Sequence, residues 1–386
     1  MLHVLLAACA VYSASCLVLL LVNVLALPRL SRERPLEGAV PFLSIVVPAR
    51  NEERAVGEGV ASLLAQDYPS FEVIVVDDRS TDRTREILDA VPAKDRLRVV
   101  TGAEPPAGWL GKPHALWQGA RAARGELFLF VDADVRYHPR AVSQAVAFLS
   151  RRNADFVCLF PRLETVTFWE SVLMPNLDCA VFLGPAFLAN RDRPRWLAAG
   201  GGAGNLVRRA AYEAIGGHEP LRTSVIDDVR LALAIRAAGF RTRVVLAKDR
   251  VAVRMYHGFR EVWNGFTKNV AYALGGWTGA VFFAIAAAWT AVSILPPAVL
   301  VLAAAAPSVL GAPPRDLLLA AAAFSGLVLA RAILAALSGD RIRFAVTQPL
   351  MAAVWAALLV RSVWQRAVRR QLVWRGRAFD ARKAGF

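Results

Sequence analysis

The chain has 386 residues, of which 56% are hydrophobic and 20% are charged, and its formal net charge is +15. Its apolar residues are concentrated at the two ends, which excludes a soluble protein built around one large core. Nucleic-acid binding is disfavoured, because no zinc-finger spacing, basic helix or RNA-recognition motif accompanies the positive charge. The four cysteines form no CxxC pair and have no histidine cluster beside them, so neither a disulfide framework nor a zinc site is indicated. We therefore expect one catalytic domain joined to membrane segments, with positive charge that faces anionic headgroups or a phosphorylated substrate.

An uncharged apolar stretch fills residues 2–27. At about 1.5 Å per residue, it is long enough to cross a hydrocarbon core of roughly 30 Å. A cleaved signal peptide is the alternative, but its cationic start is missing and the apolar run is too long. Arg29, Arg32 and Arg34 follow directly, and basic residues beside a span stay on the cytoplasmic side. The sequence predicts a transmembrane anchor over residues 1–28, in an integral protein of the cell membrane whose catalytic domain is cytoplasmic.

Short β-rich runs then alternate with segments of helical spacing. The β-rich runs cover residues 42–48, 71–76 and 127–131, and helical spacing covers residues 52–66 and 113–124. This alternation predicts an α/β catalytic domain with a mostly parallel, Rossmann-like sheet over residues 40–255. Ligands of such sheets bind at the carboxyl ends of the strands, and the polar clusters of this sequence fall there.

Asp77 and Asp78 end the second predicted strand. The Ser-Thr-Asp sequence at residues 80–82 suits the start of a helix that continues through Ile87. Capping does not explain two adjacent acids after four apolar residues. We expect at least one of these carboxylates to accept hydrogen bonds from the donor, for example from a base or a ribose.

The sequence Asp132-Ala133-Asp134 ends the third predicted strand. Two carboxylates at this spacing can share a hard divalent cation, Mg²⁺ or Mn²⁺, which neutralises a diphosphate. A diphosphate is the leaving group when a sugar is transferred from a nucleotide donor. Such a pair is common by chance, but its place at a strand end after Asp77 and Asp78 favours a metal site.

Residues 165–198 are apolar but are interrupted by three prolines. A membrane span is one interpretation. An interfacial segment near the active site is preferred, because a lipid acceptor must reach that site from the bilayer.

Asp227 and Asp228 open a predicted helix. The helix dipole by itself favours acids at this position. Beside a metal site, however, a carboxylate that takes a proton from an acceptor hydroxyl is the missing catalytic group.

The chain becomes apolar again in its last third. We expect an interfacial segment over residues 256–275, a C-terminal membrane region over residues 276–362 and a basic tail over residues 363–386. The membrane region contains three apolar stretches, at residues 277–306, 316–337 and 344–360. Three further crossings from a cytoplasmic domain would place the basic tail outside, against the expected charge asymmetry. Either one segment is re-entrant or the Pro296-Pro297 stretch is irregular.

In their order, these motifs resemble the family-2 glycosyltransferases over roughly residues 40–270. The motifs that carry the resemblance are Val47-Pro48-Ala49-Arg50-Asn51-Glu52, Asp77-Asp78, Gly111-Lys112, Asp132-Ala133-Asp134, Gly204-Asn205 and Asp227-Asp228. The chain is most similar to a membrane-bound branch that glycosylates lipids, including carotenoid- and hopanoid-associated enzymes. The resemblance implies a GT-A fold, a divalent metal and inversion at the anomeric carbon.

The resemblance also implies roles for single residues. Donor binding falls to Pro48, Arg50, Glu52, Asp78, Lys112 and Asp132, the metal to Asp132 and Asp134, the catalytic base to Asp228, and the acceptor side to Asp227, Gly204, Asn205 and Trp263. Two positions depart from the family pattern, since Asp227 stands where Glu is usual and Trp117 replaces an Asn that often follows the Lys.

The sequence thus predicts an inverting, metal-dependent transfer of a sugar from a UDP- or GDP-sugar to a hydroxyl or carboxyl of a polyprenoid-like lipid. A processive polysaccharide synthase is the alternative, but its Gln-x-x-Arg-Trp motif is reduced here to the sequence at residues 259–263. A non-catalytic membrane partner that retains the fold is a third interpretation, against which the intact acids argue. A dinucleotide-binding oxidoreductase is excluded, because no glycine-rich fingerprint follows the first strand. The oligomeric state is not indicated.

Overall fold

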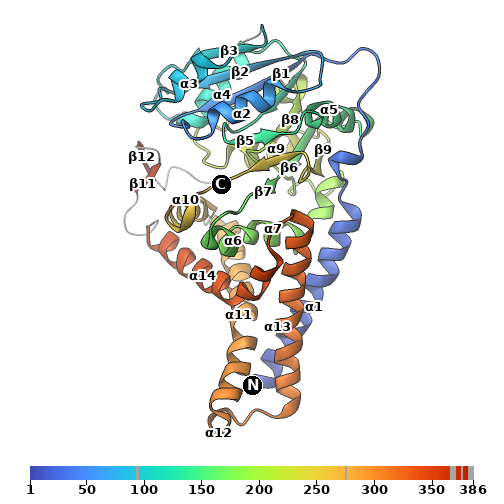
Figure 1. Cartoon of the computed structure of the whole chain (residues 1–386), viewed down its shortest axis with the longest axis vertical. Helices are drawn as coiled ribbons and strands as arrows, with labels where there is room; N and C mark the ends of the chain where they lie inside the picture. Colours follow the sequence, from blue (N-terminus) through green and yellow to red (C-terminus); the bar gives the residue numbers. More distant parts are fainter. Residues whose placement is uncertain (93–94, 274–275, 366–370, 375–376, 381–386) are drawn as a thin grey trace.

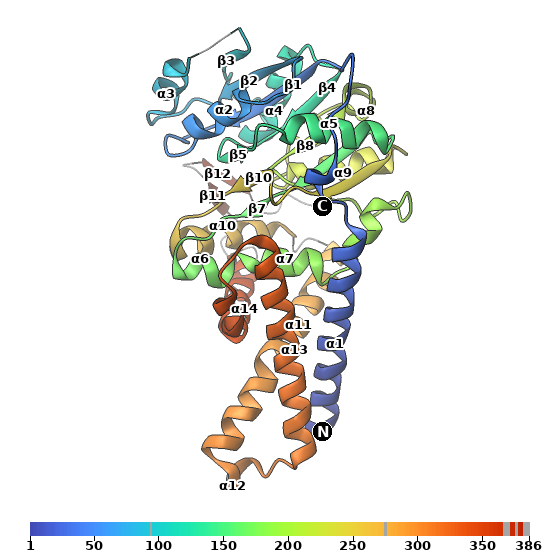
Figure 2. The ribbon, with the colours of Figure 1, turned by 45° about the vertical axis from the view of Figure 1, so that its right-hand side comes forward.

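The computed structural model of the protein describes residues 1–92, 95–273, 276–365, 371–374 and 377–380. An α/β domain forms one end of the molecule, and long helices extend from it to the other end (Figure 1). A layer of short helices lies between these two parts (Figures 1 and 2). The architecture of this domain agrees with the predicted α/β class.

A seven-stranded sheet forms the centre of the α/β domain, in the order β3-β2-β1-β4-β8-β6-β9. The strands are β1 (Leu43–Ala49), β2 (Phe71–Asp77), β3 (Leu97–Thr101), β4 (Leu127–Phe130), β6 (Phe156–Phe160), β8 (Asn205–Arg208) and β9 (Thr242–Leu246). Only β8 runs antiparallel to its two neighbours, so the sheet is mostly parallel as predicted.

Helices cover both faces of this sheet, because alternate residues of each central strand are apolar on both sides. Ile45 and Val47 of β1 face one core, which is shared with α2 (Val56–Leu64) and α5 (Ala141–Arg151). Val46 faces the opposite core, which is shared with two other helices. These helices are α4 (Gly111–Ala122) and α9 (Asp227–Ala237). The continuous apolar runs of the sequence are thus explained by burial on both faces.

The predicted elements differ from the observed ones mainly at their starts. The helix expected over residues 52–66 begins at Val56, because residues 50–55 form the loop that leaves β1. In that loop, Asn51 has a positive φ of 53°, which a helix does not allow. The helix expected after Asp82 is α3 (Thr84–Ala90).

A small second sheet has the order β5-β10-β7. Its strands are β5 (Val135–Tyr137), β10 (Val251–Val253) and β7 (Arg162–Leu163). β5 follows directly after Asp134 and pairs with β10, the strand that precedes α10. The two sheets therefore meet beside the predicted metal site.

Short helices form the layer between the domain and the long helices. They are α6 (Phe168–Leu173), α7 (Pro175–Phe182), a 3-10 turn at Ala186–Asn190 and α10 (Gly258–Ala273). None of the three elements within residues 165–198 is long enough to cross a bilayer. Of the two interpretations that the sequence left open for this region, a membrane span or an interfacial segment, the structure therefore disfavours the span.

Among the residues that the structure describes, four helices are long and apolar enough to cross a membrane. The first span is α1 (Leu2–Ala26), the second is Phe283–Ala305 within α11 (Gly276–Ala305), and the third is α13 (Pro314–Ser338). The fourth span, Ile342–Trp364, ends with α14 (Gln348–Trp364). Pro296 and Pro297 lie inside α11, which continues through them.

The helix α14 takes a different course from the other three. Whereas α1, α11 and α13 run the length of the bundle, α14 stays at the end nearest the α/β domain, beside α10 (Figures 1 and 2). Trp355 donates a hydrogen bond to the carbonyl oxygen of Leu173 in α6 at 3.3 Å, and Ser362 donates to that of Thr267 in α10 at 3.0 Å. Within the described residues, the chain thus ends on the side of the α/β domain. Residues 366–370, 375–376 and 381–386 of the predicted basic tail lie outside the described residues.

Polar side chains of the long helices hold the short ones in place. Arg331 of α13 donates to two carbonyl oxygens of α6 at 3.1 and 2.8 Å. Asn23 of α1 donates to two carbonyl oxygens at the end of α7 at 2.8 and 2.7 Å. Asp178 of α7 contacts both Lys248, at 2.8 Å, and Ser338 of α13, at 2.7 Å. An unpaired buried polar group costs free energy, so these hydrogen bonds favour the observed packing of α6 and α7 against the bundle.

Candidate active site

A single cavity of about 1220 Å³ gathers most of the residues predicted from the sequence. It lies at the carboxyl ends of β1, β2 and β4, where the parallel part of the sheet opens. The predicted residues in its wall are Pro48, Arg50, Glu52, Asp78, Lys112, Asp132, Asp134, Asp227 and Asp228. Segments that are up to 180 residues apart in sequence are thus brought to one place, from Pro48 to Asp228.

Two neighbouring loops form the part of the cavity next to β1 and β2. The Arg50 guanidinium donates to the carbonyl oxygen of Asp78 at 2.6 Å and lies 3.8 Å from its carboxylate. Asp78 is 5% exposed, so its carboxylate is almost wholly withdrawn from solvent. The amide of Glu52 donates to the hydroxyl of Thr84 at 2.7 Å, which ties the loop after β1 to α3. The two loops therefore form one rigid wall.

Asp77 does not line the cavity. Its carboxylate accepts a hydrogen bond from the amide of Ser80 at 3.1 Å, inside the turn that leads to α3. Its carbonyl oxygen accepts from the amides of Arg79 and Gly102, each at 2.8 Å. The contacts of Asp77 shape the turn, whereas Asp78 faces the cavity.

Lys112 joins the acids of two different segments. Its Nζ lies 2.6 Å from Oδ1 of Asp132 and 4.0 Å from Oδ1 of Asp227. Burial by itself would lower the pKa of Lys112, but the carboxylates of Asp132, Asp227 and Asp228 raise it above its ordinary value. Lys112 is therefore a fixed positive charge between the end of β4 and the start of α9.

Asp134 lies in the same wall as Asp132 and Glu52. Burial, and then the neighbouring carboxylates of Asp132 and Glu52, raise the pKa of Asp134. Like charges at close range disfavour ionisation unless a cation balances them. Among the described residues, no group of three or more His, Cys, Asp or Glu side chains forms a cage around a metal. The Asp132 and Asp134 carboxylates would supply two oxygen ligands of the kind that hard divalent cations prefer.

The acids at the start of α9 differ in their surroundings. Asp227 is 2% exposed, and burial raises its pKa, opposed by Lys112 and reinforced by Asp228 and Asp132. Asp228 is half-buried and lines the cavity. One oxygen of its carboxylate accepts from the amide of Val229 at 2.8 Å. Asp228 is therefore the more accessible carboxylate of the pair.

A glycine-rich loop, residues 200–202, forms the floor next to both acidic pairs. A Cβ on Gly202 would overlap Oδ2 of Asp132, and a Cβ on Gly200 would overlap the carbonyl oxygen of Asp228. The amide of Asp132 donates to the carbonyl oxygen of Gly202 at 2.8 Å. Sequence reasoning missed this loop, although the run of three glycines was a visible signal of close backbone approach.

Gly204 and Asn205 support this loop and do not line the cavity. Asn205 is 2% exposed; its side chain accepts from the amide of Gly201 at 3.1 Å and donates to the carbonyl oxygen of Asp228 at 3.3 Å. A Cβ on Gly204 would overlap the hydroxyl of Tyr137. Both residues thus lie behind the glycine loop, on the protein side of it.

The cavity continues from the acids to the layer of short helices. Leu177, Ala180 and Val181 of α7 give it an apolar wall. The start of α10 and the residues before it add a polar wall that includes Tyr256 and Arg260. The sequence predicted an interfacial segment near the site within residues 165–198, but it did not single out the residues of α7 and α10 that line the cavity.

Trp263 of α10 does not line the cavity. Its ring stacks on Phe259, with ring centroids 5.5 Å apart and an interplanar angle of 27°. The guanidinium of Arg361 lies 5.5 Å from the ring centroid of Trp263 on the side of α14. Trp263 therefore packs between α10 and α14.

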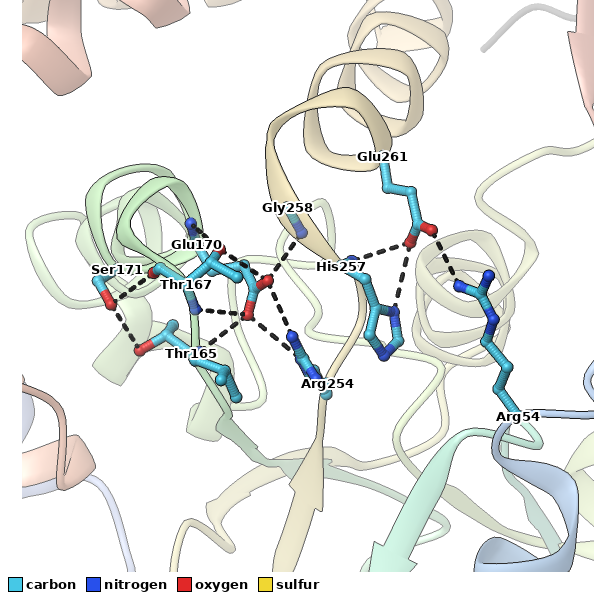
Figure 3. A network of polar contacts seen from close by, with 10 residues as sticks. Arg54, Thr165, Thr167, Glu170, Ser171, Arg254, His257, Gly258 and Glu261 are labelled. Atoms are coloured by element: carbon cyan, nitrogen blue, oxygen red, sulfur yellow. Dashed lines mark hydrogen bonds and ion pairs between the residues drawn. The ribbon is translucent and has the colours of Figure 1, made fainter.

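Polar contacts attach the start of α10, and Arg254 just before it, to α6 and to the α/β domain (Figure 3). Glu170 of α6 is fully buried, pairs with Arg254 at 3.1 Å and accepts from the amide of Gly258 at 2.7 Å. Glu261 of α10 lies 3.4 Å from Arg54, which belongs to the loop that leaves β1. The start of α10 is thus attached both to α6 and to the loop that carries Arg50 and Glu52.

Comparisons with known proteins bear on the family and the fold of the chain. Residues 44–216 match the family Glycosyl transferase family 2. The 4,4'-diaponeurosporenoate glycosyltransferases of Staphylococcus aureus strains MRSA252 and USA300 are 29% identical over 237 and 238 residues. Each match covers 61% of this chain and 62% of the relative, so the chain spans less than two thirds of these relatives' length.

A solved structure resembles nearly the whole chain. The mannosyltransferase PcManGT of Pyrobaculum calidifontis, in complex with GDP-Man and Mn²⁺, has a TM-score of 0.54 at 21% sequence identity. The match covers 95% of this chain and 99% of that one. At this identity the likeness establishes the fold. Residues 44–216 are therefore similar to a family-2 glycosyltransferase domain, and the chain has a GT-A-like fold flanked by apolar helices, as predicted.

Proposed function

We propose that this protein transfers a sugar from a nucleotide-sugar to a hydroxyl or carboxyl of a lipid, at the cytoplasmic face of the membrane. The reaction is metal-dependent and inverts the anomeric carbon. One observation carries the proposal: a single cavity contains the acids at the ends of β2 and β4, those at the start of α9 and the apolar wall of α7. A donor and a lipid can therefore meet in one space.

The donor lies against the carboxyl ends of β1, β2 and β4. Arg50 and Asp78 form the wall for the nucleoside, since their buried hydrogen-bonding groups are held rigidly. Asp132 and Asp134 hold a divalent cation, Mg²⁺ or Mn²⁺, which when bound supplies charge neutralisation for the diphosphate. Lys112 keeps Asp132 in place and adds positive charge close to the same diphosphate.

Asp228 acts as the general base toward a hydroxyl acceptor. The acceptor oxygen forms a bond to the anomeric carbon while the bond between that carbon and the diphosphate oxygen breaks, and the acceptor proton passes to the Asp228 carboxylate. The electron pair of the broken bond stays with the nucleoside diphosphate. A carboxyl acceptor is ionised at neutral pH and needs no base, so in that case Asp228 has only a positioning role.

The acceptor lipid enters between α7 and α10. This route is supported by the apolar side chains of α7 in the cavity wall and by the place of both helices beside the bundle. The names of the Staphylococcus aureus relatives, which describe glycosyl transfer to a carotenoid acid, also support a lipid acceptor. The hopanoid branch of the resemblance remains an alternative acceptor class.

The catalytic domain lies on the cytoplasmic side. The arginines after α1 favour this orientation. A course in which α1, α11 and α13 cross and α14 returns keeps the tail on the same side, which removes the conflict raised by a simple count of apolar stretches.

A donor panel tests the proposal directly. Membranes that contain the protein are incubated with labelled UDP- and GDP-sugars plus Mg²⁺ or Mn²⁺, and the labelled lipid is identified by mass spectrometry. A single sugar on a lipid is expected. A polymeric product would instead support a processive synthase, and the absence of any donor binding would support a non-catalytic protein.

Variants of the acids separate their roles. Asp134→Ala should lose metal dependence and donor binding together. Asp228→Asn should keep donor binding and, with a hydroxyl acceptor, lose about 10²- to 10⁴-fold in transfer rate. Asp249→Asn is the matched control, because Asp249 is half-exposed and lies outside the cavity. Transfer to an alcohol by Asp228→Asn at the wild-type rate would show that Asp228 is not the base.

A further inference from the structure

A second cavity, of about 310 Å³, lies where α1 reaches the catalytic domain. Its wall is built from the end of α1, the 3-10 turn Leu30–Arg32 that follows it, the end of α5, the 3-10 turn after α7, and β9. The lining residues are Leu25, Ala26, Leu27, Pro28, Arg29, Arg32, Glu33, Phe148, Arg152, Asn190 and Arg243. It shares no lining residue with the active-site cavity.

Four arginines give this cavity a strong positive charge. Among the described residues, no carboxylate lies within ion-pair distance of Arg29, Arg32 or Arg152. Arg243 pairs with the exposed Asp192 at 2.8 Å. The one acid in the wall, Glu33, is already paired with Arg151 at 3.1 Å. The cavity therefore has an excess of cationic groups that face a space large enough for a phosphate ester.

The wall is held rigidly by contacts between its elements. Gln144 of α5 donates to the carbonyl oxygen of Glu33 at 2.9 Å, and the amide of Leu246 in β9 donates to that of Pro28 at 2.8 Å. Asn190 exchanges two hydrogen bonds with the backbone of Val244, at 3.0 and 2.7 Å. The arginines are thus presented from fixed backbone positions, which favours a defined ligand over a diffuse surface charge.

One side of the cavity is apolar and adjoins the lipid-facing surface of α1. Leu25 is 86% exposed and belongs to the helix proposed to cross the membrane. Leu27 and Phe148 are buried apolar residues in the same wall. A ligand in this place meets arginines with its polar end and the hydrocarbon region with its other end.

From these observations we infer that the cavity binds the headgroup of an anionic phospholipid at the cytoplasmic surface. The phosphate and a second polar group of the headgroup pair with Arg29, Arg32 and Arg152, and the acyl chains lie along Leu25 on α1. Arginine suits this role because its planar guanidinium can donate two parallel hydrogen bonds to one phosphate. The inference rests on the proposed membrane insertion of α1 and is independent of sugar transfer.

Lipid binding to the purified full-length protein in a zwitterionic detergent tests this inference. The probes are dioctanoyl phosphatidylglycerol, dioctanoyl phosphatidylcholine and inorganic phosphate, and binding is followed by thermophoresis of the labelled protein. Phosphatidylglycerol should bind saturably and about tenfold or more tightly than phosphatidylcholine, as expected for charge-assisted hydrogen bonds. Inorganic phosphate at the same concentration should not displace it.

Variants of exposed arginines locate the binding. Arg32→Gln combined with Arg152→Gln should weaken phosphatidylglycerol binding at least about tenfold, since two charge-assisted contacts are lost. Arg34→Gln is the matched control, because Arg34 is also exposed, lies two residues from Arg32 and does not line the cavity. Thermal unfolding of each variant shows that it is folded, and Arg32→Lys with Arg152→Lys should restore part of the affinity.

Three results would overturn the inference. Equal affinities for the two lipids would exclude headgroup selection. An Arg34→Gln loss as large as that of the double variant would show a diffuse surface charge. Displacement of phosphatidylglycerol by an equal concentration of inorganic phosphate would identify a site for a free anion, with no contribution from the lipid.

Discussion

Replacement of Glu170 by Gln tests how firmly α10 is attached to the rest of the enzyme. The buried Glu170 carboxylate accepts two hydrogen bonds from Arg254, at 3.2 and 3.1 Å. It also accepts from the amides of Gly258 and Val166, at 2.7 and 2.8 Å, and from the hydroxyl of Thr167, at 2.8 Å. A neutral amide keeps the shape of this side chain, removes its charge and leaves the Arg254 guanidinium without its counter-ion.

The size of the effect follows from proton linkage. Burial by itself would raise the pKa of Glu170, but the hydrogen bonds from Arg254, the two amides and Thr167 lower it from 4.5 to about 2. Since each tenfold change in proton affinity corresponds to about 1.4 kcal/mol, ionised Glu170 stabilises the folded state by about 3 kcal/mol at neutral pH. Loss of one partner of a buried ion pair typically costs about 3–5 kcal/mol, which agrees. Because the folded-state pKa lies below the unfolded one, this contribution is complete above about pH 4.5 and disappears as the pH falls toward about 2.

Thermal unfolding of the purified protein in detergent, followed by tryptophan fluorescence, measures this contribution. Glu170→Gln should lower the midpoint by several degrees at neutral pH, and the difference from wild type should shrink between about pH 4.5 and 2. Glu86→Gln is the matched control, because Glu86 also pairs with an arginine, Arg83 at 3.1 Å, but is 68% exposed. An exposed pair of this kind contributes little, so its midpoint should not move. If Glu170→Gln unfolded at the wild-type midpoint, or if its deficit were the same at every pH, the assigned role of this ion pair would be refuted.

Two further predictions concern the glycine loop and the membrane course. Gly202→Ala should abolish donor turnover, because its Cβ would overlap the Asp132 carboxylate. Gly201→Ala should keep donor turnover, since a Cβ at that position has only an ordinary contact at 3.9 Å. A steady-state assay of both variants tests this, and full activity of Gly202→Ala would contradict the close approach of Gly202 to Asp132. Single cysteines introduced at Arg34 and Val363 should react with an impermeant maleimide from the same side of the membrane, because α14 ends beside the α/β domain. A single cysteine at Arg315 should react from the opposite side. Labelling of the Val363 position together with that of Arg315 would instead mean that α14 crosses.

The strands and the acids of the site were predictable because each depends on local sequence. Residues 71–76 form a β-rich run that is buried on both faces of the sheet, and the acids follow it where the strand must end. Asp132 and Asp134 follow β4 for the same reason. The carboxyl ends of parallel strands meet at one edge, so the order of the motifs already implied a common site.

The supports of the site were not predictable in the same way. The contact between Arg54 and Glu261 joins residues 207 positions apart, and Asn205 holds the backbone of Asp228 across 23 positions. Such pairs leave no period or spacing in the sequence. Asp77 and Asp78 are adjacent and of the same residue type, yet the turn after β2 directs Asp78 into the cavity and keeps the Asp77 carboxylate hydrogen-bonded within the turn.

The sequence by itself determined the α/β class, the acids that mark the site and the four stretches apolar enough to enter a membrane, because these properties depend on composition and on local periodicity. Only the tertiary structure decided that Trp263 packs against α14 and that α7 and α10 complete the cavity. It alone also decided that α14 turns back beside them. Hydropathy measures how apolar a segment is and carries no direction, whereas the course of a helix is set by the surfaces on which it packs.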